Sequence, residues 1–485
     1  MTEAMPFPTR IQRTEAMVGA CLFWLLLGSY AYFWQFRGWN EGSRLMLTYA
    51  LVDHGRIAID GLEQQTGDLA YRDGHYYSLK PPGHAIIAIP LYALLRLVMP
   101  PHPLNGPEIK YWWPDYLLTV ATSGVATAVA GVLLWQTARV AGASSALAIL
   151  LCVSFGLGSS AFTYATLFSG HPVAGCFAFA AVILALRDVP TNRGVVVAGF
   201  CAGAATATEY PFVCLLPALV VAIAFKTKHW KLGAMFGLSS GLVVAGLLIY
   251  HVMAFGGPFK TGYSFITDPE FQKVYTPDNP IGLQFPTWQR TINVLFSSHG
   301  LIWYAPLTLL TPFGLWSWWR ERRFAELWLF FWTFGVFLTV NAAHPTWTGG
   351  YSTGPRYTQA ALVFAYWPIA SLLKSSRWAA YVVWALLLPG IFVGLGATAC
   401  SYGGRLPDIG TPGGNNPISE VILRDYQDGF VGSSFGNVLL HGSWHHTDRA
   451  NLESLYPLLV FWELMLAFLI LLACRSRRGG RDGTA

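Results

Sequence analysis

Charged residues are scarce in this sequence of 485 residues. Asp, Glu, Lys and Arg together make up 12% of the chain, whereas hydrophobic residues make up 54% and aromatic residues 15%. With a mean hydropathy of +0.42, the chain lacks the polar residues needed to cover a water-soluble globule, so we predict an integral membrane protein. The net charge of +6 comes from short basic clusters between apolar runs. Such clusters are typical of cytoplasmic loops and argue against nucleic-acid binding.

Motifs of several common site types are also absent. Of the seven cysteines, only Cys400 lies in a polar loop, so the sequence contains neither a disulfide framework nor a CxxC metal motif. No P-loop, no GxGxxG motif before a helix and no HExxH motif occurs. The adjacent pair His445-His446 is discounted as a metal site, because neighbouring side chains point apart on most backbones. We therefore expect no resident cofactor and leave open whether a divalent metal is needed.

Apolar runs long enough to span a bilayer dominate the chain, since about 20 apolar residues cross a membrane as a helix. We expect twelve such spans, near residues 18–36, 115–137, 141–158, 172–187, 194–208, 211–225, 231–255, 301–319, 324–341, 357–373, 378–397 and 455–474. One further run, 84–99, is shorter, carries Arg96 and lies between Pro82 and Pro100.

The basic clusters decide where run 84–99 lies. If it does not cross the membrane, clusters holding more than half of the 31 Lys and Arg fall on one side, as cytoplasmic loops do. We therefore predict a helix at the outer interface, with both termini cytoplasmic in a bacterial inner membrane. The predicted fold is all-α, a single multi-span domain over residues 1–485. Its periplasmic loops are expected at 37–114, which would hold juxtamembrane helices, and at 256–300, 342–356 and 398–454.

The first outer loop carries the most informative motifs. Asn40-Glu41-Gly42-Ser43-Arg44 follows the first span directly, and 43–52 has apolar residues at helical spacing, which predicts a helix on the membrane surface ending near Gly55. Tyr77-Ser78-Leu79-Lys80-Pro81-Pro82 comes next. This loop resembles "DExRY…YxxKPPL" of the GT-C superfamily of polyprenyl-phosphate-dependent glycosyltransferases, especially the lipid A aminoarabinose transferase and protein O-mannosyltransferase groups. The second outer loop, 159–171, usually holds an acid in that superfamily, but here it has none and ends in His171.

The resemblance implies that a sugar passes from a lipid phosphate to an acceptor, usually with inversion at the anomeric carbon. Such a reaction needs a base for the acceptor and cations for the departing phosphate. Glu41 is the predicted base, because partial desolvation at the bilayer boundary raises the pKa of a carboxylate toward the useful range. Asp53, Asp68 and Asp73 are alternatives. Glu41 could also serve only as an ion-pair partner of Arg44.

Two cations are predicted to bind the donor phosphate. Lys80 is held at the membrane face by two prolines, although it could also be a snorkelling anchor. Arg356 follows the glycine-rich segment "HPTWTGGYSTGPRY" (344–357), which could alternatively be only a tight aromatic reversal. The other predicted substrate contacts are Arg44, Tyr77, His84, Tyr351 and His171. Weaker candidates are Glu209, Lys260, Tyr263, His299, Trp347 and Tyr357.

The leading hypothesis is therefore an inverting membrane glycosyltransferase (EC 2.4 class) with a periplasmic active site. Its partners would be a polyprenyl-phosphate sugar and a lipid, glycan or protein acceptor. A transporter or flippase of lipid-linked sugars is a second hypothesis, but apart from Glu463 few ionisable residues fall within the spans. A scaffold without chemistry is a third hypothesis, and it would not need Lys, Arg and carboxylate on one face.

Overall fold

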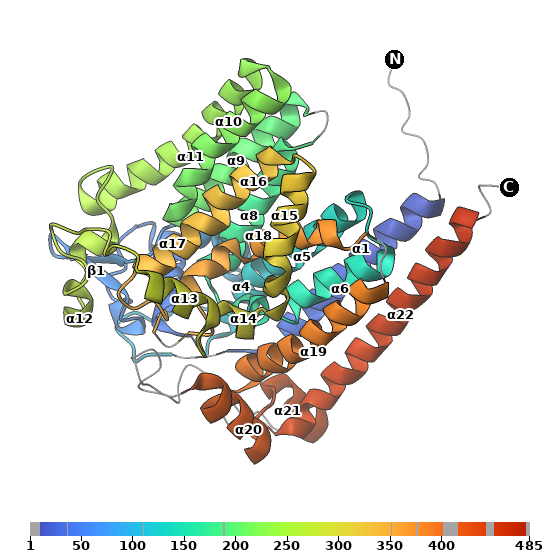
Figure 1. The fold of residues 1–485 in the computed structure, drawn as a ribbon. Coiled ribbons are helices and arrows are strands. Elements are labelled where there is room, and N and C mark those ends of the chain that lie inside the picture. The colour runs from blue at the N-terminus through green and yellow to red at the C-terminus, as the bar shows by residue number, and fades with distance from the viewer. Residues whose placement is uncertain are drawn as a thin grey trace.

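The computed structural model describes residues 10–35, 37–109, 111–187, 190–350, 352–374, 377–400, 416–442 and 451–481. In this part of the chain the structure is helical apart from one two-stranded antiparallel hairpin, which confirms the all-α class. Figure 1 shows the first turns of α1 and the last turns of α22 lying together at one edge of the molecule. The hairpin and α12 lie at the opposite edge (Figure 1).

The helices and strands follow each other along the chain as one series. They are α1 (Arg10–Ala31), α2 (Trp39–His54), β1 (Leu69–Arg72), β2 (His75–Ser78), α3 (Gly83–Leu95), α4 (Trp113–Thr119), α5 (Val125–Val140), α6 (Ser145–Gly156), α7 (Ala161–Ala165), α8 (Gly170–Ala185), α9 (Asn192–Thr208), α10 (Leu215–Thr227), α11 (Trp230–Phe255), α12 (Pro269–Gln272), α13 (Trp288–Phe296), α14 (Leu301–Tyr304), α15 (Thr311–Arg320), α16 (Phe324–Phe330), α17 (Val336–Ala343), α18 (Leu362–Tyr366), α19 (Arg377–Ala399), α20 (Leu423–Asp428), α21 (Ser434–His441) and α22 (Tyr456–Arg481).

Seven helical segments in the described residues are long and apolar enough to cross a membrane, so the protein is a multi-pass membrane protein. They are Arg13–Ala31, Trp113–Val140, Tyr210–Thr227, Trp230–Phe255, Phe324–Ala343, Ala379–Ala399 and Leu452–Leu472. An eighth candidate consists of two helical pieces, Trp288–Tyr304 and Pro306–Arg320, that meet at a bend of 117°.

The other expected spans are shorter or broken. Helices α6, α8 and α9 have 12, 16 and 17 residues. Segment 357–373 is not one α-helix, because α18 has only five residues and lies between two 3-10 turns, the second containing Pro368. Proline has no backbone N–H for the α-helical ladder, which favours such an interruption. The apolar runs in the sequence therefore predicted where helices lie, but not whether each run forms one unbroken helix.

Close packing of α9 against α11 depends on glycine. A Cβ atom added at Gly199 would lie 2.4 Å from the backbone oxygen of Phe236, and one at Gly203 would lie 2.9 Å from the oxygen of Ser240. Without side chains at these positions the two backbones approach each other directly, as small residues allow in membrane helices. The end of α11 then reaches the first outer loop, where Phe255 contacts Tyr77.

Segment 37–114, predicted to be the first outer loop, folds over a small core of its own. Nine consecutive residues of α2, Gly42–Ala50, are buried, so most of this expected surface helix is covered by protein. Helix α3 has 13 residues and is about 20 Å long, too short for a hydrocarbon layer of about 30 Å. Its place at the outer interface stays a prediction, because α6 and α8 are also shorter than a full span.

The hairpin of β1 and β2 pairs Leu69 with Ser78 and Arg72 with His75. Its turn has positive φ angles at Asp73 (52°) and Gly74 (87°), as a two-residue hairpin turn requires. Both outer edges of the hairpin are covered. Ala70 pairs with Ile266 from the 256–300 loop, and the N–H of Ile59 donates to the oxygen of Tyr76 at 2.8 Å.

Candidate active site

Lys80 emerges from the end of β2 and forms a buried ion pair. Its Nζ lies 2.8 Å from Oδ2 of Asp68, and the two side chains are 9% and 8% exposed. The hydroxyl of Ser43 on α2 links the segment that contains Asp68 to the segment that contains Lys80. It donates to the backbone oxygen of Asp68 at 2.7 Å and accepts from the N–H of Leu79 at 3.0 Å. Burial acts to lower the pKa of Lys80, but the Asp68 carboxylate outweighs it and the pKa is raised. Lys80 is therefore a positively charged group.

Arg44 lies within α2, about one and a half turns after its first residue, and its side chain forms a second buried ion pair. Its Nη2 lies 2.9 Å from Oε1 of Glu209, which is at the break between α9 and the following 3-10 turn. Nδ1 of His171 lies 3.3 Å from the same oxygen, although not in hydrogen-bond geometry. Gly170 leaves room for this arrangement, since a Cβ there would lie 2.7 Å from the Glu209 oxygen. The guanidinium of Arg44 is thus held by Glu209, which lies 165 residues further along the chain.

Glu41 lies in the first turn of α2. Burial is the largest influence and raises the pKa of its carboxyl group, although Arg44 and Arg356 act to lower it and Asp68 adds to the rise. Glu41 forms no ion pair within the described residues. Glu41 therefore lies close enough to Arg44 and Arg356 for both cations to affect its pKa. Its raised pKa is a property expected of a general base.

Arg356 begins the 3-10 turn after the glycine-rich loop, where Gly349, Gly350 and Gly354 have φ angles of 80°, 71° and 64°. Its guanidinium carbon lies 5.2 Å from the ring centre of Tyr357. Arg356 has no ion pair in the part of the chain that the structure describes, and its Nε is buried without a hydrogen-bond partner there. Unlike Arg44 and Lys80, this cation is not already matched by a carboxylate.

A row of aromatic rings connects Lys80 with Arg356. Lys80 lies 5.7 Å from the ring centre of Tyr263, which stacks on Tyr275 at 4.7 Å. The hydroxyl of Tyr275 contacts Nε2 of His344 at 3.1 Å. The ring of His344 lies 4.6 Å from that of Tyr357, which contacts Arg356. Burial, followed by the nearby Arg356, lowers the pKa of His344 to about 4, so this ring is neutral near pH 7.

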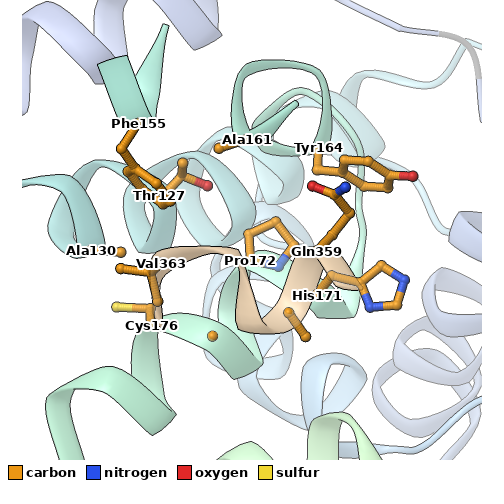
Figure 2. A pocket seen from close by; sticks show the side chains of 12 residues that line it. Thr127, Ala130, Phe155, Ala161, Tyr164, His171, Pro172, Cys176, Gln359 and Val363 are labelled. Atoms are coloured by element: carbon orange, nitrogen blue, oxygen red, sulfur yellow. The ribbon is translucent and has the colours of Figure 1, made fainter. Parts of the chain in front are cut away.

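Two small pockets adjoin this charge cluster. Figure 2 shows the first, with Ala130, Cys176 and Val363 on one side and Gln359 and Tyr164 on the other. His171 also lines it, so the pocket runs from the charged residues into the apolar bundle. The second pocket lies between the end of the first span and α4, and Glu41 is among its lining residues.

The structure thus brings together four of the predicted residues, Glu41, Arg44, Lys80 and Arg356, with His171 beside Arg44. Tyr77 lies apart from them in the outer-loop core, against Phe255. His84 is fully buried, contacts Thr122 through Nε2 at 2.8 Å and stacks on Phe168 at 3.8 Å. Tyr351 falls outside the described residues.

The alternative bases are each committed to another contact. Asp53 accepts from Tyr92 at 2.7 Å and pairs with Arg96, which ties α2 to α3. Asp73 pairs with Arg72 in the exposed hairpin turn. Asp68 pairs with Lys80. Among the described residues, no group of three His, Cys, Asp or Glu could hold a metal ion.

Sequence reasoning missed three residues of the cluster. His344 opens the segment "HPTWTGGYSTGPRY", and Tyr164 belongs to segment 159–171, so both lay in segments predicted to be external. The hydroxyl of Tyr164 donates to the oxygen of Thr353 at 3.2 Å, which joins that loop to the glycine-rich one. Tyr275 had no local signal, because its role depends on contacts with Tyr263 and His344 from other parts of the chain.

The structures that the chain resembles in a comparison with known proteins include two of low sequence identity. No family model matches the sequence, and no curated protein matches it. The chain is similar to crystal structures of ArnT from Cupriavidus metallidurans bound to undecaprenyl phosphate (13% identity, TM-score 0.46) and in the apo state (15% identity, TM-score 0.47). The matches cover 95% of this chain and 77% and 76% of the ArnT chains.

Proposed function

We propose that the protein is a glycosyltransferase that moves a sugar from a polyprenyl phosphate to an acceptor at the outer face of a bacterial inner membrane. The observation that carries the proposal is the convergence of Glu41, Lys80 and Arg356 in one cluster at the base of the outer loops. Burying charged groups is costly, and carboxylates whose pKa is raised by burial beside other charged groups are typical of functional sites.

The two cations are suited to a lipid phosphate. Lys80 supplies a buried ammonium and Arg356 a guanidinium that no carboxylate neutralises within the described chain. The phosphate of a membrane lipid lies at the level of the polar headgroups, where basic side chains of outer loops can meet it. The aromatic row between the two cations offers ring faces on which the sugar can lie.

Glu41 acts as the base in this reaction. It takes the proton from the acceptor hydroxyl as the acceptor oxygen attacks the anomeric carbon of the donor sugar. The bond between that carbon and the phosphate oxygen breaks, and its electron pair leaves with the phosphate. Lys80 and Arg356 stabilise the charge that develops on the departing group. The products are a glycosylated acceptor with inverted configuration, polyprenyl phosphate and a protonated Glu41.

The test uses the full-length protein in vesicles with undecaprenyl-phosphate donors that carry labelled mannose, glucose or arabinose. We expect release of undecaprenyl phosphate by the wild type and loss of that release in Glu41→Gln. Glu270→Gln is the matched control, because the Glu270 side chain is 78% exposed and forms an exposed pair with Lys273. Movement of intact donor across the vesicle without release would instead indicate a flippase. The proposal would be overturned if the wild type neither released undecaprenyl phosphate nor showed a thermal shift when undecaprenyl phosphate was added.

A further inference from the structure

His344 is buried beside the aromatic row and contacts two tyrosine hydroxyls through one ring nitrogen. Its Nε2 lies 3.1 Å from the hydroxyl of Tyr275 and 3.4 Å from the hydroxyl of Tyr357. His344 is 4% exposed, whereas Tyr275 and Tyr357 are only half-buried. A ligand that reaches the aromatic row would therefore contact the tyrosines rather than the imidazole.

A backbone contact decides which nitrogen of His344 carries the proton. The N–H of Thr346 donates to Nδ1 of His344 at 3.1 Å, so Nδ1 is unprotonated. The pKa of His344 is lowered to about 4, first by burial and then by Arg356, so the ring is neutral near pH 7. A neutral imidazole has one protonated nitrogen. That nitrogen is Nε2, and its N–H donates to the two hydroxyls.

This tautomer leaves the protons of both hydroxyls unused. A phenol hydroxyl can donate one hydrogen bond and also accept, and Tyr275 and Tyr357 accept from the imidazole. Nη2 of Arg356 also donates to the hydroxyl of Tyr357, at 3.5 Å, which again occupies an acceptor position and not the proton. Within the described residues neither hydroxyl has an acceptor for its proton. An oxygen atom of a ligand would supply one.

His251 shows the opposite tautomer in the same chain. Its Nδ1 lies 3.0 Å from the backbone oxygen of Pro258, and its Nε2 lies 3.0 Å from the hydroxyl of Tyr210. A carbonyl oxygen can only accept, so Nδ1 of His251 is protonated and Nε2 accepts the proton of Tyr210. The hydroxyl proton of Tyr210 is therefore used within the protein, whereas those of Tyr275 and Tyr357 are not.

The charges around the two hydroxyls favour an anionic acceptor. The ring centre of Tyr357 lies 5.2 Å from the guanidinium carbon of Arg356. Burial is the largest influence on the pKa of Tyr275 and raises it, and Arg356 and Asp68 lie close enough to act on it as well. Asp68 is neutralised by Lys80, whereas Arg356 has no carboxylate partner in the described part of the chain. Hydrogen bonds from hydroxyls to charged oxygens are also stronger than those to neutral ones.

We propose that His344 is a positioning residue for the sugar donor, which it does not contact itself. It holds the hydroxyls of Tyr275 and Tyr357 in place so that both donate hydrogen bonds to the donor phosphate. This inference rests on the proposed function and deepens it, because it adds two neutral donors to the cations at the phosphate. When the sugar leaves, negative charge grows on the phosphate oxygens, and hydrogen bonds to these oxygens become stronger.

The first experiment determines the tautomers. Full-length protein with nitrogen-15 in its histidines is placed in lipid nanodiscs, and NMR distinguishes protonated from unprotonated ring nitrogens by their chemical shifts. The signals are assigned by their loss in His344→Phe or His344→Gln and in His251→Phe. We expect a protonated Nε2 in His344 and a protonated Nδ1 in His251. An unprotonated Nε2 in His344 would overturn the proposal.

The second experiment measures the affinity for undecaprenyl phosphate. Tyr275→Phe and Tyr357→Phe should each weaken binding about tenfold, because each removes a hydrogen bond to a charged group. His344→Phe should weaken binding at least threefold in the wild type, but less than twofold in the variant that lacks both hydroxyls, because it acts through them. His251→Phe is the matched control and should leave binding within twofold. Equal effects of His344→Phe in the two backgrounds would contradict the positioning role.

The tyrosine variants also cover the case in which His344→Phe does not fold. If the wild type binds and releases undecaprenyl phosphate while neither Tyr275→Phe nor Tyr357→Phe weakens binding, this inference is overturned and the proposed function stands. If the wild type does not bind undecaprenyl phosphate at all, the proposed function fails and this inference fails with it. The two failures are therefore distinguishable.

Discussion

Lys80 and Asp68 form a buried ion pair of 2.8 Å, so the ammonium assigned to the donor phosphate already has a partner. A phosphate carries several strong acceptor oxygens and can compete with a carboxylate for the same ammonium. Arg356 lies close enough to affect the pKa of Lys80 and is not paired within the described chain. The phosphate of the donor would therefore bind between Lys80, which is already paired with Asp68, and Arg356, which has no carboxylate partner within the described chain.

The Lys80–Asp68 pair should be costly to break on one side only. Lys80→Met leaves Asp68 as a buried carboxylate without its partner, and we expect a loss of about 3–5 kcal/mol in stability. Adding Asp68→Asn removes the unmatched charge and should recover much of that loss. Thermal unfolding of the two variants measures the difference. Recovery of stability without recovery of sugar transfer would assign Lys80 to the reaction, whereas equal stability of the single variant and the wild type would contradict the burial argument.

Sugar transfer should decline on the acidic side of its pH profile because of Glu41. Burial raises the pKa of this group above its usual range, and the base must be deprotonated. The rate therefore falls as the pH decreases through the raised pKa, at a pH above the ordinary glutamate value of about 4.3. Glu41→Gln should lower kcat by about 10² to 10⁴ fold and remove this limb. An unchanged acidic limb in any residual activity would assign it to another group.

Glu209 should matter more than an exposed glutamate. Glu209→Gln weakens the ion pair with Arg44, whose side chain is 2% exposed, and we expect a loss of about 3–5 kcal/mol because an arginine is left buried and unmatched. Glu270→Gln removes an exposed pair with Lys273 and should change stability by less than about 1 kcal/mol. Thermal unfolding compares the two. Similar effects would show that the buried pair contributes no more than a surface one.

The packing of α9 against α11 predicts opposite effects of two alanine substitutions. At Gly199 an added Cβ meets the Phe236 oxygen at 2.4 Å, so Gly199→Ala should destabilise the protein by about 1–3 kcal/mol. At Gly241, on α11, an added Cβ meets nothing within 4 Å, and the higher helix propensity of alanine should make Gly241→Ala neutral or stabilising by up to about 1 kcal/mol. Unfolding midpoints of both variants test the pair.

Membrane orientation can be tested by cysteine labelling in intact cells. Tyr71 in β1 is 47% exposed and Phe324, at the start of α16, is 54% exposed. We expect a membrane-impermeant maleimide to label Tyr71→Cys from outside and Phe324→Cys only after the membrane is opened. The reverse pattern would place the candidate site in the cytosol and contradict the proposed function.

Local motifs allowed much of the candidate site to be predicted. Glu41 and Arg44 share the start of one helix, and Lys80 follows in the same loop, so predicting their proximity required little beyond the assignment of this loop to one side of the membrane. Arg356 joined them because loops 37–114 and 342–356 were assigned to the same face. Their roles in the reaction stay predictions, as do those of Tyr77, His84 and Tyr351.

Contacts between distant segments could not be predicted. Arg44 and Glu209 are separated by 165 residues, and their contact depends on where α9 ends next to α2. The partner of Lys80 was also not identified, because the hairpin strands have four residues each, too few for alternation to be distinguished from a loop. The number of continuous spans could not be predicted either. The breaks at 357–373 and near residue 305 depend on packing between helices as much as on proline.

The strand pairing beside the candidate site has a consequence for biosynthesis. Thr267 donates to the oxygen of Leu69 across 198 residues of chain, and Ala70 pairs with Ile266. A two-stranded hairpin is marginally stable by itself, so the ribbon that carries Asp68 and leads to Lys80 gains its third segment only after the ribosome has produced α11. The nascent protein would therefore complete this strand pairing beside the candidate site only after roughly half of the polypeptide has been synthesised.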